Sequence, residues 1–219
     1  MISEVYNEDC MIGMARYPDK YFDLAVVDPP YGIGEDGSSN KTRGLLARSK
    51  DYKPFSGNDS EPPSMEYFDE LIRVSKNQII WGANHFLSRI KLDTSCWVVW
   101  DKDNGQTDFA DCELAWTSFK TAVRKFKFKW QGMLQEDMKN KEIRIHPTQK
   151  PVKLYDWIYK NYLPQGGKVI DTHLGSGSSR IAADKAGNID FYGWELDTDY
   201  FNAQEKRWSD FKKQLIMAF

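Results

Sequence analysis

Residues 168–196 constrain the fold of this chain more than any other stretch. An apolar run ending at Asp171 predicts a strand, a loop rich in Gly and Ser follows, and residues 179–186 predict a helix that Gly187 ends. A second apolar run covers 189–196, and the residues from 199 onward are again helical in pattern. Strand, helix, strand and helix in this order predict a parallel sheet with right-handed crossovers, and therefore an α/β fold.

The loop of this unit has the features of a nucleotide-type cofactor site. Gly175 and Gly177 permit a tight turn and let a ligand approach the backbone closely, although many ordinary turns also hold two glycines. Glu195 ends the next strand, 24 residues after Asp171, where a carboxylate can accept hydrogen bonds from ribose hydroxyls. Asp171 would repel a phosphate, and no GxxxxGK[ST] loop is present. A cofactor with a positive or neutral centre, such as S-adenosylmethionine, is favoured over a dinucleotide.

Two further motifs lie outside this unit. The sequence AVVDPPYGIG begins at Ala25, and its apolar run 22–27 predicts a strand that ends at Asp28. The two prolines after Asp28 form either a stiff turn or a rigid set of hydrogen-bond acceptors. The sequence HPTQKP at 146–151 precedes a helix predicted over 151–162. Its lysine and the free N–H groups of the helix suit a carboxylate such as that of methionine, unless the prolines only bracket a turn.

The rest of the chain predicts one large domain or one domain with a small insert. Strand-like runs cover 2–6, 78–81, 96–100 and 112–118, and helical patterns run up to Tyr17 and over 64–75. The polar region 32–63 is too long for an ordinary connection, so we expect it to be functional or mobile.

The charge of the chain is unevenly distributed. The net charge is −2, which excludes a uniformly basic coat, yet residues 41–53 carry +4 and residues 119–145 carry +5, so the remainder carries −11. This pattern suits either a face that meets a polyanion or two solvated loops. Lysines alternate with aromatic residues over 125–130, which predicts an edge strand protected by lysines, a basic face toward phosphates, or both.

Cysteines and hydropathy exclude several other classes of protein. The three cysteines, Cys10, Cys96 and Cys112, form no CxxC pair, so we expect neither a disulfide framework nor a metal site. The N-terminus lacks a basic-then-apolar signal region, and no apolar run approaches the roughly 18 residues of a membrane span. A cytoplasmic protein without membrane contact is expected.

Together, the motifs resemble those of the amino-methylating DNA methyltransferases, which act on adenine N6 or cytosine N4. DPPY at 28–31 resembles the catalytic motif, DTHLGSGS at 171–178 the cofactor loop, and HPTQKP at 146–151 the motif before it. The order of the motifs is that of the permuted beta class, and segments 81–86, 100–102 and 113–116 resemble those of small phage or prophage enzymes. The resemblance covers nearly the whole chain. It departs at His173, where Phe is usual, at Ser178, where Thr is common, and in the short region between 118 and 146.

The resemblance implies a fold and a domain plan. The fold is α/β, a Rossmann-like S-adenosylmethionine-dependent methyltransferase fold with a mostly parallel twisted sheet, an antiparallel strand and a circularly permuted motif order. Residues 1–219 form a single domain with a mobile loop at 32–63 and a short target-recognition insert at about 119–145. Double-stranded DNA is the implied partner, and the resemblance also admits a homodimer and a cognate restriction endonuclease.

It also implies roles for individual residues. The implied catalytic residues are Asp28, Pro29, Pro30 and Tyr31, with the Asp28 carboxylate and the Pro29 carbonyl accepting the two amine hydrogens and Tyr31 stacking on a flipped base. The implied cofactor residues are Asp9, Asp28, His146, Thr148, Gln149, Lys150, Asp171, His173, Leu174, Gly175, Ser176, Gly177, Ser178, Glu195 and Leu196. The candidate DNA contacts are Lys41, Arg43, Arg48, Lys50, Lys53, Arg124, Lys125, Lys127 and Lys129. Asp101 and Lys102 should lie near the target pocket, and Asn84 and His85 either touch the base or cap a helix.

The expected reaction is methyl transfer to the N6 amine of adenine, since the family associates DPPY mostly with adenine. Three alternatives stay open: a cytosine-N4 enzyme, an RNA or protein-glutamine methyltransferase, and an inactive DNA-binding subunit. Methylation of cytosine at carbon 5 is rejected, because no cysteine lies in a Pro-Cys setting to act as the nucleophile.

Overall fold

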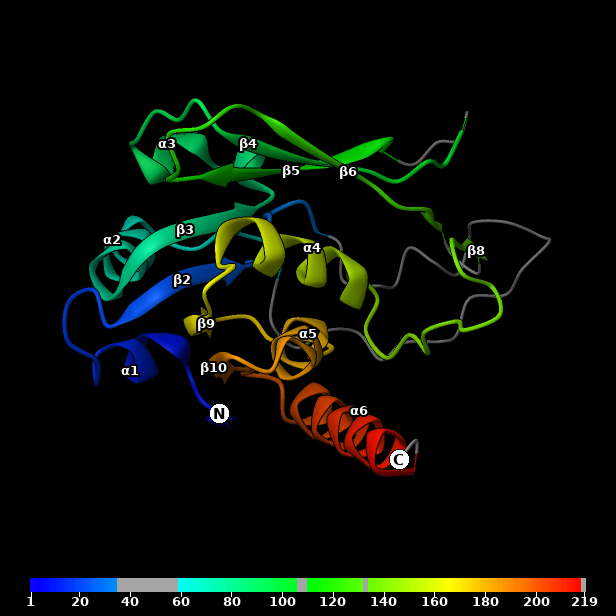
Figure 1. Ribbon diagram of the computed structural model, residues 1–219. Coiled ribbons are helices and arrows are strands. Elements are labelled where there is room, and N and C mark those ends of the chain that lie inside the picture. The colour runs from blue at the N-terminus through cyan, green and yellow to red at the C-terminus, as the bar shows by residue number, and fades with distance from the viewer. Residues whose placement is uncertain (35–58, 106–109, 132–133, 218–219) are drawn as a thin grey trace.

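The computed structural model describes residues 1–34, 59–105, 110–131 and 134–217 (Figure 1). An eight-stranded sheet has the order β1-β10-β9-β2-β3-β5-β4-β6. The first five strands in this order are parallel, β5 runs antiparallel to both neighbours, and β6 pairs parallel with β4 at the edge. The strands are β1 (Ser3–Tyr6), β2 (Phe22–Val27), β3 (Ser75–Trp81), β4 (Trp97–Asp101), β5 (Cys112–Thr117), β6 (Arg124–Lys127), β9 (Gly167–Asp171) and β10 (Ile189–Trp194). The predicted α/β fold with a mostly parallel sheet and an antiparallel strand is confirmed.

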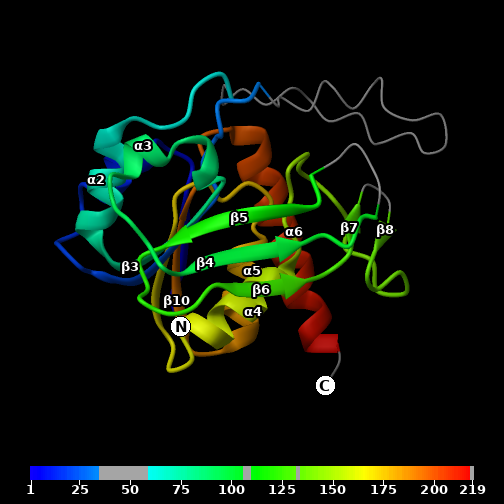
Figure 2. The same cartoon turned by 90° about the horizontal axis from the view of Figure 1, so that it is seen from above.

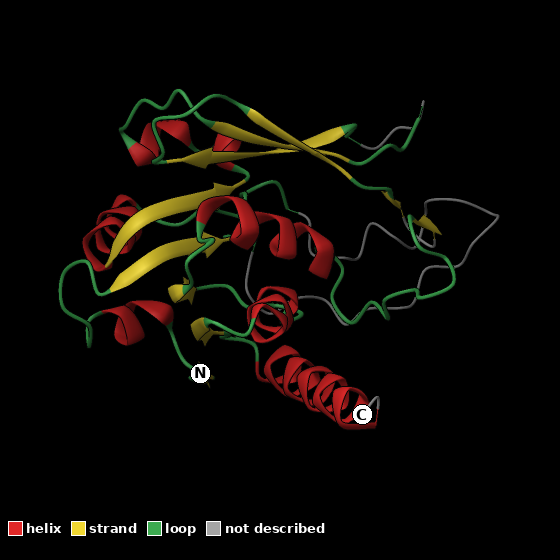
Figure 3. Ribbon diagram, in the orientation of Figure 1, coloured by secondary structure: helices red, strands yellow, loops and turns green. Residues whose placement is uncertain are grey.

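Helices cover both faces of the sheet (Figures 1 and 3). One buried cluster joins the sheet to α1 (Cys10–Met14), α2 (Met65–Val74) and the segment containing the 3-10 turn η2 (Ala83–His85) and α3 (Leu87–Ile90). The other cluster joins the opposite face to α4 (Val152–Tyr162) and α5 (Ser178–Ala186), with α6 (Thr198–Met217) packing against its rim. Figure 2 shows α4, α5 and α6 on the same side of the sheet. Within the described residues, no helix is long and apolar enough to cross a membrane.

Burial on both faces explains the composition of the central strands. In β2, the sequence FDLAVV leaves only Asp23 partly exposed, as expected for a strand in the middle of a parallel sheet. Val26 and Leu24 belong to the α4 side, while Ala25 and Val27 belong to the α2 side. The alternation places Asp28, the next residue, on the α4 side of the carboxyl end of β2.

The direction of the crossovers reverses between β2 and β9. The connection from β9 to β10 passes through α5 on one face, and the connection from β2 to β3 passes through α2 on the other. The two connections lead away from each other along the sheet, so the carboxyl ends of β2 and β9 flank a topological switch point. Ligands of open α/β sheets bind in the crevice at such a point.

Two predicted strands end earlier than expected. The alternating segment 125–130 pairs in the sheet only up to Lys127, and Trp130 belongs instead to a small ribbon of β7 (Trp130–Gln131) and β8 (Leu134–Gln135). The buried Trp130 indole donates from Nε1 to the carbonyl of Gln149 at 2.8 Å, a bond between distant segments that no local pattern indicates. β10 ends at Trp194 rather than Leu196.

Candidate active site at the carboxyl edge of the sheet

The predicted site residues follow four parallel strands at the same edge of the sheet. Asp9 follows β1, Asp28 follows β2, the 171–178 loop follows β9 and Glu195 follows β10. Parallel strands end on one side, so residues far apart in the sequence converge there. The structure therefore brings the DPPY motif and the glycine loop together, while the side chain of Asp9 caps α1 by accepting from the N–H of Met11 at 2.7 Å.

Asp28 lies in a network of buried charges. Its Oδ2 accepts from Lys150 Nζ at 2.5 Å, and its Oδ1 accepts from the Tyr31 hydroxyl at 2.7 Å. Lys150 also lies 3.0 Å from Glu113 Oε2, and the side chain of Lys150 is only 3% exposed. Burial raises the pKa of Asp28, Lys150 lowers it, and Glu113 raises it.

Tyr31 depends on a glycine for its position. Its ring stacks on His85 at 5.3 Å, and it lies so close to Gly82 that a Cβ there would come within 2.0 Å of the ring. Gly82 has φ +69°, a left-handed conformation that favours glycine. His85 thus contacts the ring of a predicted catalytic residue, and Asn84 is exposed in the same short turn. Base stacking by Tyr31 stays a prediction.

The glycine loop is held by Glu195. The Glu195 carboxylate accepts from the N–H of Gly175 at 2.7 Å and from the N–H of Asp197 at 2.9 Å. Gly175 and Gly177 have φ of +52° and +70°, left-handed conformations that favour glycine and form the predicted tight turn. Burial raises the pKa of Glu195, and the two N–H donors lower it. Leu196, a predicted cofactor contact, is exposed beside it.

Asp171 and His173 lie at the carboxyl end of β9 and are joined by a hydrogen bond. Asp171 accepts from the hydroxyl of Ser179 at 2.5 Å and from the N–H of His173 at 3.1 Å. Burial raises the pKa of Asp171 to about 7, and the charges of Asp28 and Glu195 contribute to the increase. The His173 Nδ1 lies 2.9 Å from the hydroxyl of Thr172, and burial lowers the pKa of this histidine to about 4. His173 is therefore neutral at pH 7.

The 146–151 segment contacts both parts of the site. The ring of His146 packs against Tyr200 at 4.3 Å and lies 3.8 Å from where a Cβ of Gly175 would be. The side chain of Gln149 accepts from the N–H of Ile145 at 2.9 Å and closes the turn, while Thr148 is exposed. Lys150, which we expected to face a cofactor carboxylate, instead contacts Asp28 and Glu113.

The lysines of the edge strand are paired with carboxylates. Lys125 lies 3.4 Å from Asp101, while Lys127 and Lys129 lie 2.9 and 3.7 Å from Asp103. Phe126 and Phe128 pack on the core from the opposite side of the strand, which confirms the predicted alternation. The candidate DNA contacts at 41–53 lie outside the described residues.

Two residues of the site, Glu113 and Arg207, were given no role by the sequence. Glu113 forms an ion pair with Lys102, which we expected near the target pocket, and joins this pair to Lys150. Arg207, far along α6, donates to the carbonyl of Ser176 at 2.8 Å and to the hydroxyl of Ser178 at 2.9 Å. Nothing local marks these residues, because each acts on a segment distant in the sequence. The only available signal was the resemblance of 100–102 and 113–116 to family segments.

The fold and the site define a class of α/β enzyme with a cofactor crevice at the switch point of a mostly parallel sheet. Residues 93–206 match the N6/N4 family described as DNA methylase. This match covers more than half of the chain, and the chain therefore belongs to that family and is a DNA methyltransferase. The DPPY motif lies outside the matched residues.

Comparisons over the whole chain agree with this assignment. The type II methyltransferase M2.MboI of Moraxella bovis is 22% identical, over 98% of this chain and 90% of the relative. The crystal structure of the M1.HpyAVI–SAM complex is similar in fold, with a TM-score of 0.57 at 20% identity over 94% of this chain and all of the other. The cytosine-N4-specific PvuII DNA methyltransferase has a TM-score of 0.59 at 11% identity, covering 98% and 92% of the two chains.

Proposed function

We propose that this enzyme transfers a methyl group from S-adenosylmethionine to the N6 amine of adenine in double-stranded DNA, after the base has left the helix. One observation carries the proposal: the Asp28 carboxylate lies at the switch point, beside the strand that leads into the 171–178 loop. The order of the motifs and the DPPY sequence further favour a beta-class, adenine-specific member.

The carboxyl groups at the carboxyl ends of the parallel strands suit this cofactor. Asp28, Asp171 and Glu195 are all buried or nearly so, and burial raises the pKa of each carboxyl. A bound cation would relieve the repulsion among them. S-adenosylmethionine supplies a sulfonium whose methyl group is electrophilic. Glu195 is the residue to hold ribose hydroxyls, and the glycine loop, with His146 beside it, is the segment to hold the rest of the cofactor.

The chain's own residues address the poor nucleophilicity of the amine. The lone pair of an exocyclic amine is delocalised into the ring, so catalysis needs acceptors for both amine hydrogens. In our proposal, Asp28 accepts one and the Pro29 carbonyl accepts the other, with the fixed φ of the prolines holding that carbonyl in place. Each carboxylate oxygen has two acceptor positions, so Asp28 can accept from the amine while Lys150 and Tyr31 stay bound.

DNA is expected along the basic parts of the chain. We propose that Arg124, Lys125, Lys127 and Lys129 contact phosphates, and that the three lysines do so by exchanging Asp101 and Asp103 for the polyanion. The lysine–aspartate pairs are well exposed to solvent, so each contributes little to stability and is open to this exchange. The basic segment 41–53 belongs to the region 32–63 that directly follows the catalytic motif, and it is proposed to contact the DNA around the flipped base.

Transfer of labelled methyl groups to unmethylated DNA tests the proposal. The wild-type protein should label DNA, hydrolysis should yield N6-methyladenine, and Asp28→Ala should reduce the rate by at least ~10²-fold. The Asp156→Asn variant, which removes a carboxylate that pairs with Lys185 on α5, serves as the control. If the hydrolysate contains N4-methylcytosine instead, the target base is cytosine and not adenine. Label in RNA or protein alone, or cofactor binding without transfer, would contradict the proposal.

A further inference from the structure

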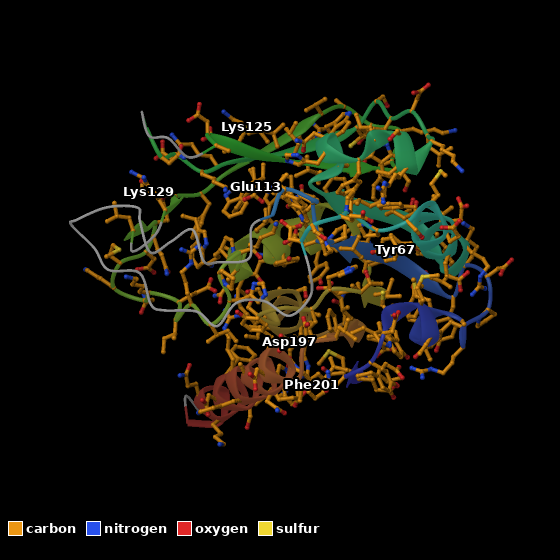
Figure 4. The ribbon with its side chains drawn as sticks, turned by 180° about the vertical axis from the view of Figure 1, so that it is seen from behind. Tyr67, Glu113, Lys125, Lys129, Asp197 and Phe201 are labelled. Carbon is orange, nitrogen blue, oxygen red and sulfur yellow. The ribbon has the colours of Figure 1, made fainter. Side chains whose placement is uncertain are left out.

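Glu113 connects two lysines next to the predicted catalytic carboxylate. One oxygen pairs with Lys102, at the end of β4, and the other lies 3.0 Å from Lys150, just before α4. Figure 4 shows Glu113 nearer the middle of the molecule than Lys125 and Lys129. Its side chain is 22% exposed, and that of Lys102 is 19% exposed. Glu113 is therefore only partly exposed, in contrast to the lysines of β6.

The sheet places Glu113 on the same face as Asp28. β5 pairs with β3 so that Ala115 lies opposite Trp81, and both side chains belong to the core on the α4 side. Glu113 is two residues from Ala115 and so points to that face, as Asp28 does two residues after Val26. Asp28 after β2 and Glu113 on β5 therefore lie in one polar cluster, which Lys150 joins from just before α4.

The ammonium of Lys150 lies close to three oxygen atoms of this cluster. An ammonium has three N–H groups, and Lys150 Nζ lies 2.5 Å from Asp28 Oδ2, 3.2 Å from the Tyr31 hydroxyl and 3.0 Å from Glu113 Oε2. With Lys102 included, two carboxylates face two ammonium groups. Loss of Glu113 would remove one ion pair of Lys150 and leave an excess positive charge within reach of Asp28.

We propose that Glu113 is a positioning residue: through Lys150 it fixes the orientation of the Asp28 carboxylate and sets the charge balance around it. The catalytic part of this inference rests on the proposed methyl transfer. Glu113 has no contact of its own with the reacting groups in this scheme. It limits how strongly the cation of Lys150 acts on Asp28, so that Asp28 remains an effective acceptor for the amine.

The charge of Glu113 predicts the sign of one measurable effect. Burial is the largest influence on the pKa of Glu113, and it is outweighed by Lys150 and Lys102, which bring this pKa down to about 2. Glu113 is thus an anion at every pH used for assays. Its negative charge raises the pKa of Asp28. Glu113→Gln should therefore lower the pKa of Asp28, whereas Glu113→Asp, which keeps the charge, should leave it near the wild-type value.

The test is a pH titration of Asp28 combined with kinetics. Carbon-13 NMR of aspartate carboxyls, with Asp28→Asn to identify the signal, should give a lower Asp28 pKa in Glu113→Gln than in the wild type. For methyl transfer, the acid limb of the kcat profile should move to lower pH, and kcat should fall by up to ~10²-fold. The dissociation constant of S-adenosylmethionine, measured by calorimetry, should not change.

Asp156→Asn is the matched control, since Asp156 lies on α4, is 14% exposed and pairs with one lysine at 2.6 Å. It should leave the Asp28 titration and the pH profile unchanged. An unchanged Asp28 pKa in Glu113→Gln, or the same kcat loss in Asp156→Asn, would overturn the inference. A shifted Asp28 pKa in a protein that methylates no DNA would instead reject the proposed function and leave the electrostatic coupling in place.

Discussion

At the scale of single residues, burial determines the chemistry of the carboxyl groups at the edge of the sheet. Asp171 is 2% exposed and receives hydrogen bonds only from a hydroxyl and one N–H among the contacts described, so its desolvation is poorly compensated. The carboxylate of Asp23, at the opposite end of β2, accepts hydrogen bonds from Lys76 Nζ at 2.7 Å and from the N–H of Lys168 at 2.8 Å. Burial raises the pKa of Asp23, but these donors outweigh it and lower the value overall. Ionisation of Asp171 should therefore destabilise the folded state, whereas ionisation of Asp23 should stabilise it.

Asp171→Asn should stabilise the unliganded protein at high pH. The folded pKa is about 7, well above the unfolded value of ~4, so ionisation costs the folded state stability as pH rises from ~4 to about 7. The stability of the variant relative to the wild type should increase across this window, by at most ~4 kcal/mol. Urea unfolding at pH 5 and pH 8 measures the difference. Asp23→Asn should show no such increase between pH 5 and pH 8, because the lowered pKa of Asp23 keeps its carboxylate ionised in the folded and unfolded states at both pH values. An equal increase in both variants would contradict the role of Asp171.

At the scale of elements, the turn after β3 determines where Tyr31 can lie. Gly82 is left-handed, and the ring of Tyr31 occupies the space that a Cβ would need. The turn after β3 therefore helps to fix the position of Tyr31, which belongs to the DPPY motif after β2. A glycine in the sequence WGANHF indicates a turn, but only the packing shows which ring fills the space beside it.

Gly82→Ala should impair both stability and methyl transfer. The left-handed conformation alone costs an alanine ~1–2 kcal/mol, and Tyr31 must also leave its hydrogen bond to Asp28. Gly187→Ala is the matched control, because Gly187 has φ +77° with open space around the added Cβ. Gly187→Ala should lose only the unfolding free energy that the left-handed conformation costs, and it should keep the wild-type methyl-transfer activity. Equal unfolding free energies and activities in the two variants would contradict the role of the close approach.

The edge strand β6 serves two purposes in our account. Lysines on an exposed edge discourage pairing with another sheet, and here they also carry the predicted contacts to phosphate. Their pairing with Asp101 and Asp103 keeps them along the strand.

Lys127→Gln should weaken DNA binding in a salt-dependent way. If Lys127 neutralises one phosphate, the slope of log affinity against log salt should decrease by ~0.9. Fluorescence anisotropy with a duplex at several salt concentrations measures the slope. Lys185→Gln, in which the lost lysine lies on α5 and pairs with Asp156 of α4, should keep the wild-type slope. An unchanged slope for Lys127→Gln would leave β6 with the edge-protecting role alone.

At the scale of the whole molecule, cofactor binding should stabilise several distant segments together, because the proposed cofactor site lies at the carboxyl ends of β1, β2, β9 and β10, which are neighbours in the sheet. S-adenosylmethionine at 100 times its dissociation constant should raise the free energy of unfolding by ~2.7 kcal/mol. Glu195→Gln, which removes the anionic acceptor of Gly175 N–H, should show a smaller increase at the same concentration. Thermal unfolding measures both, and Asp156→Asn should respond like the wild type. Equal increases in Glu195→Gln and the wild type would reject Glu195 as a cofactor residue.

Local patterns in the sequence were sufficient for most elements of the fold. Continuous apolar runs, glycine stops and alternation depend on residues a few positions apart, so they located β2, β9, α5 and the sides of β6. The conformations of Gly175 and Gly177 were predictable for the same reason. The ends of β6 and β10 were not, because tertiary contacts such as the bond from Trp130 to Gln149 determine where the pairing ends.

The sequence by itself determined the class of fold, the family resemblance and the candidate groups Asp28, Glu195 and the glycine loop. Only the tertiary structure decided which charges surround Asp28. Lys150 and Glu113 are 122 and 85 positions away from Asp28 in the chain and reach it because β2, β3 and β5 are neighbours in the sheet under α4. The pKa of a buried group depends on the distances to other charges in space, and separation along the chain does not contain that information.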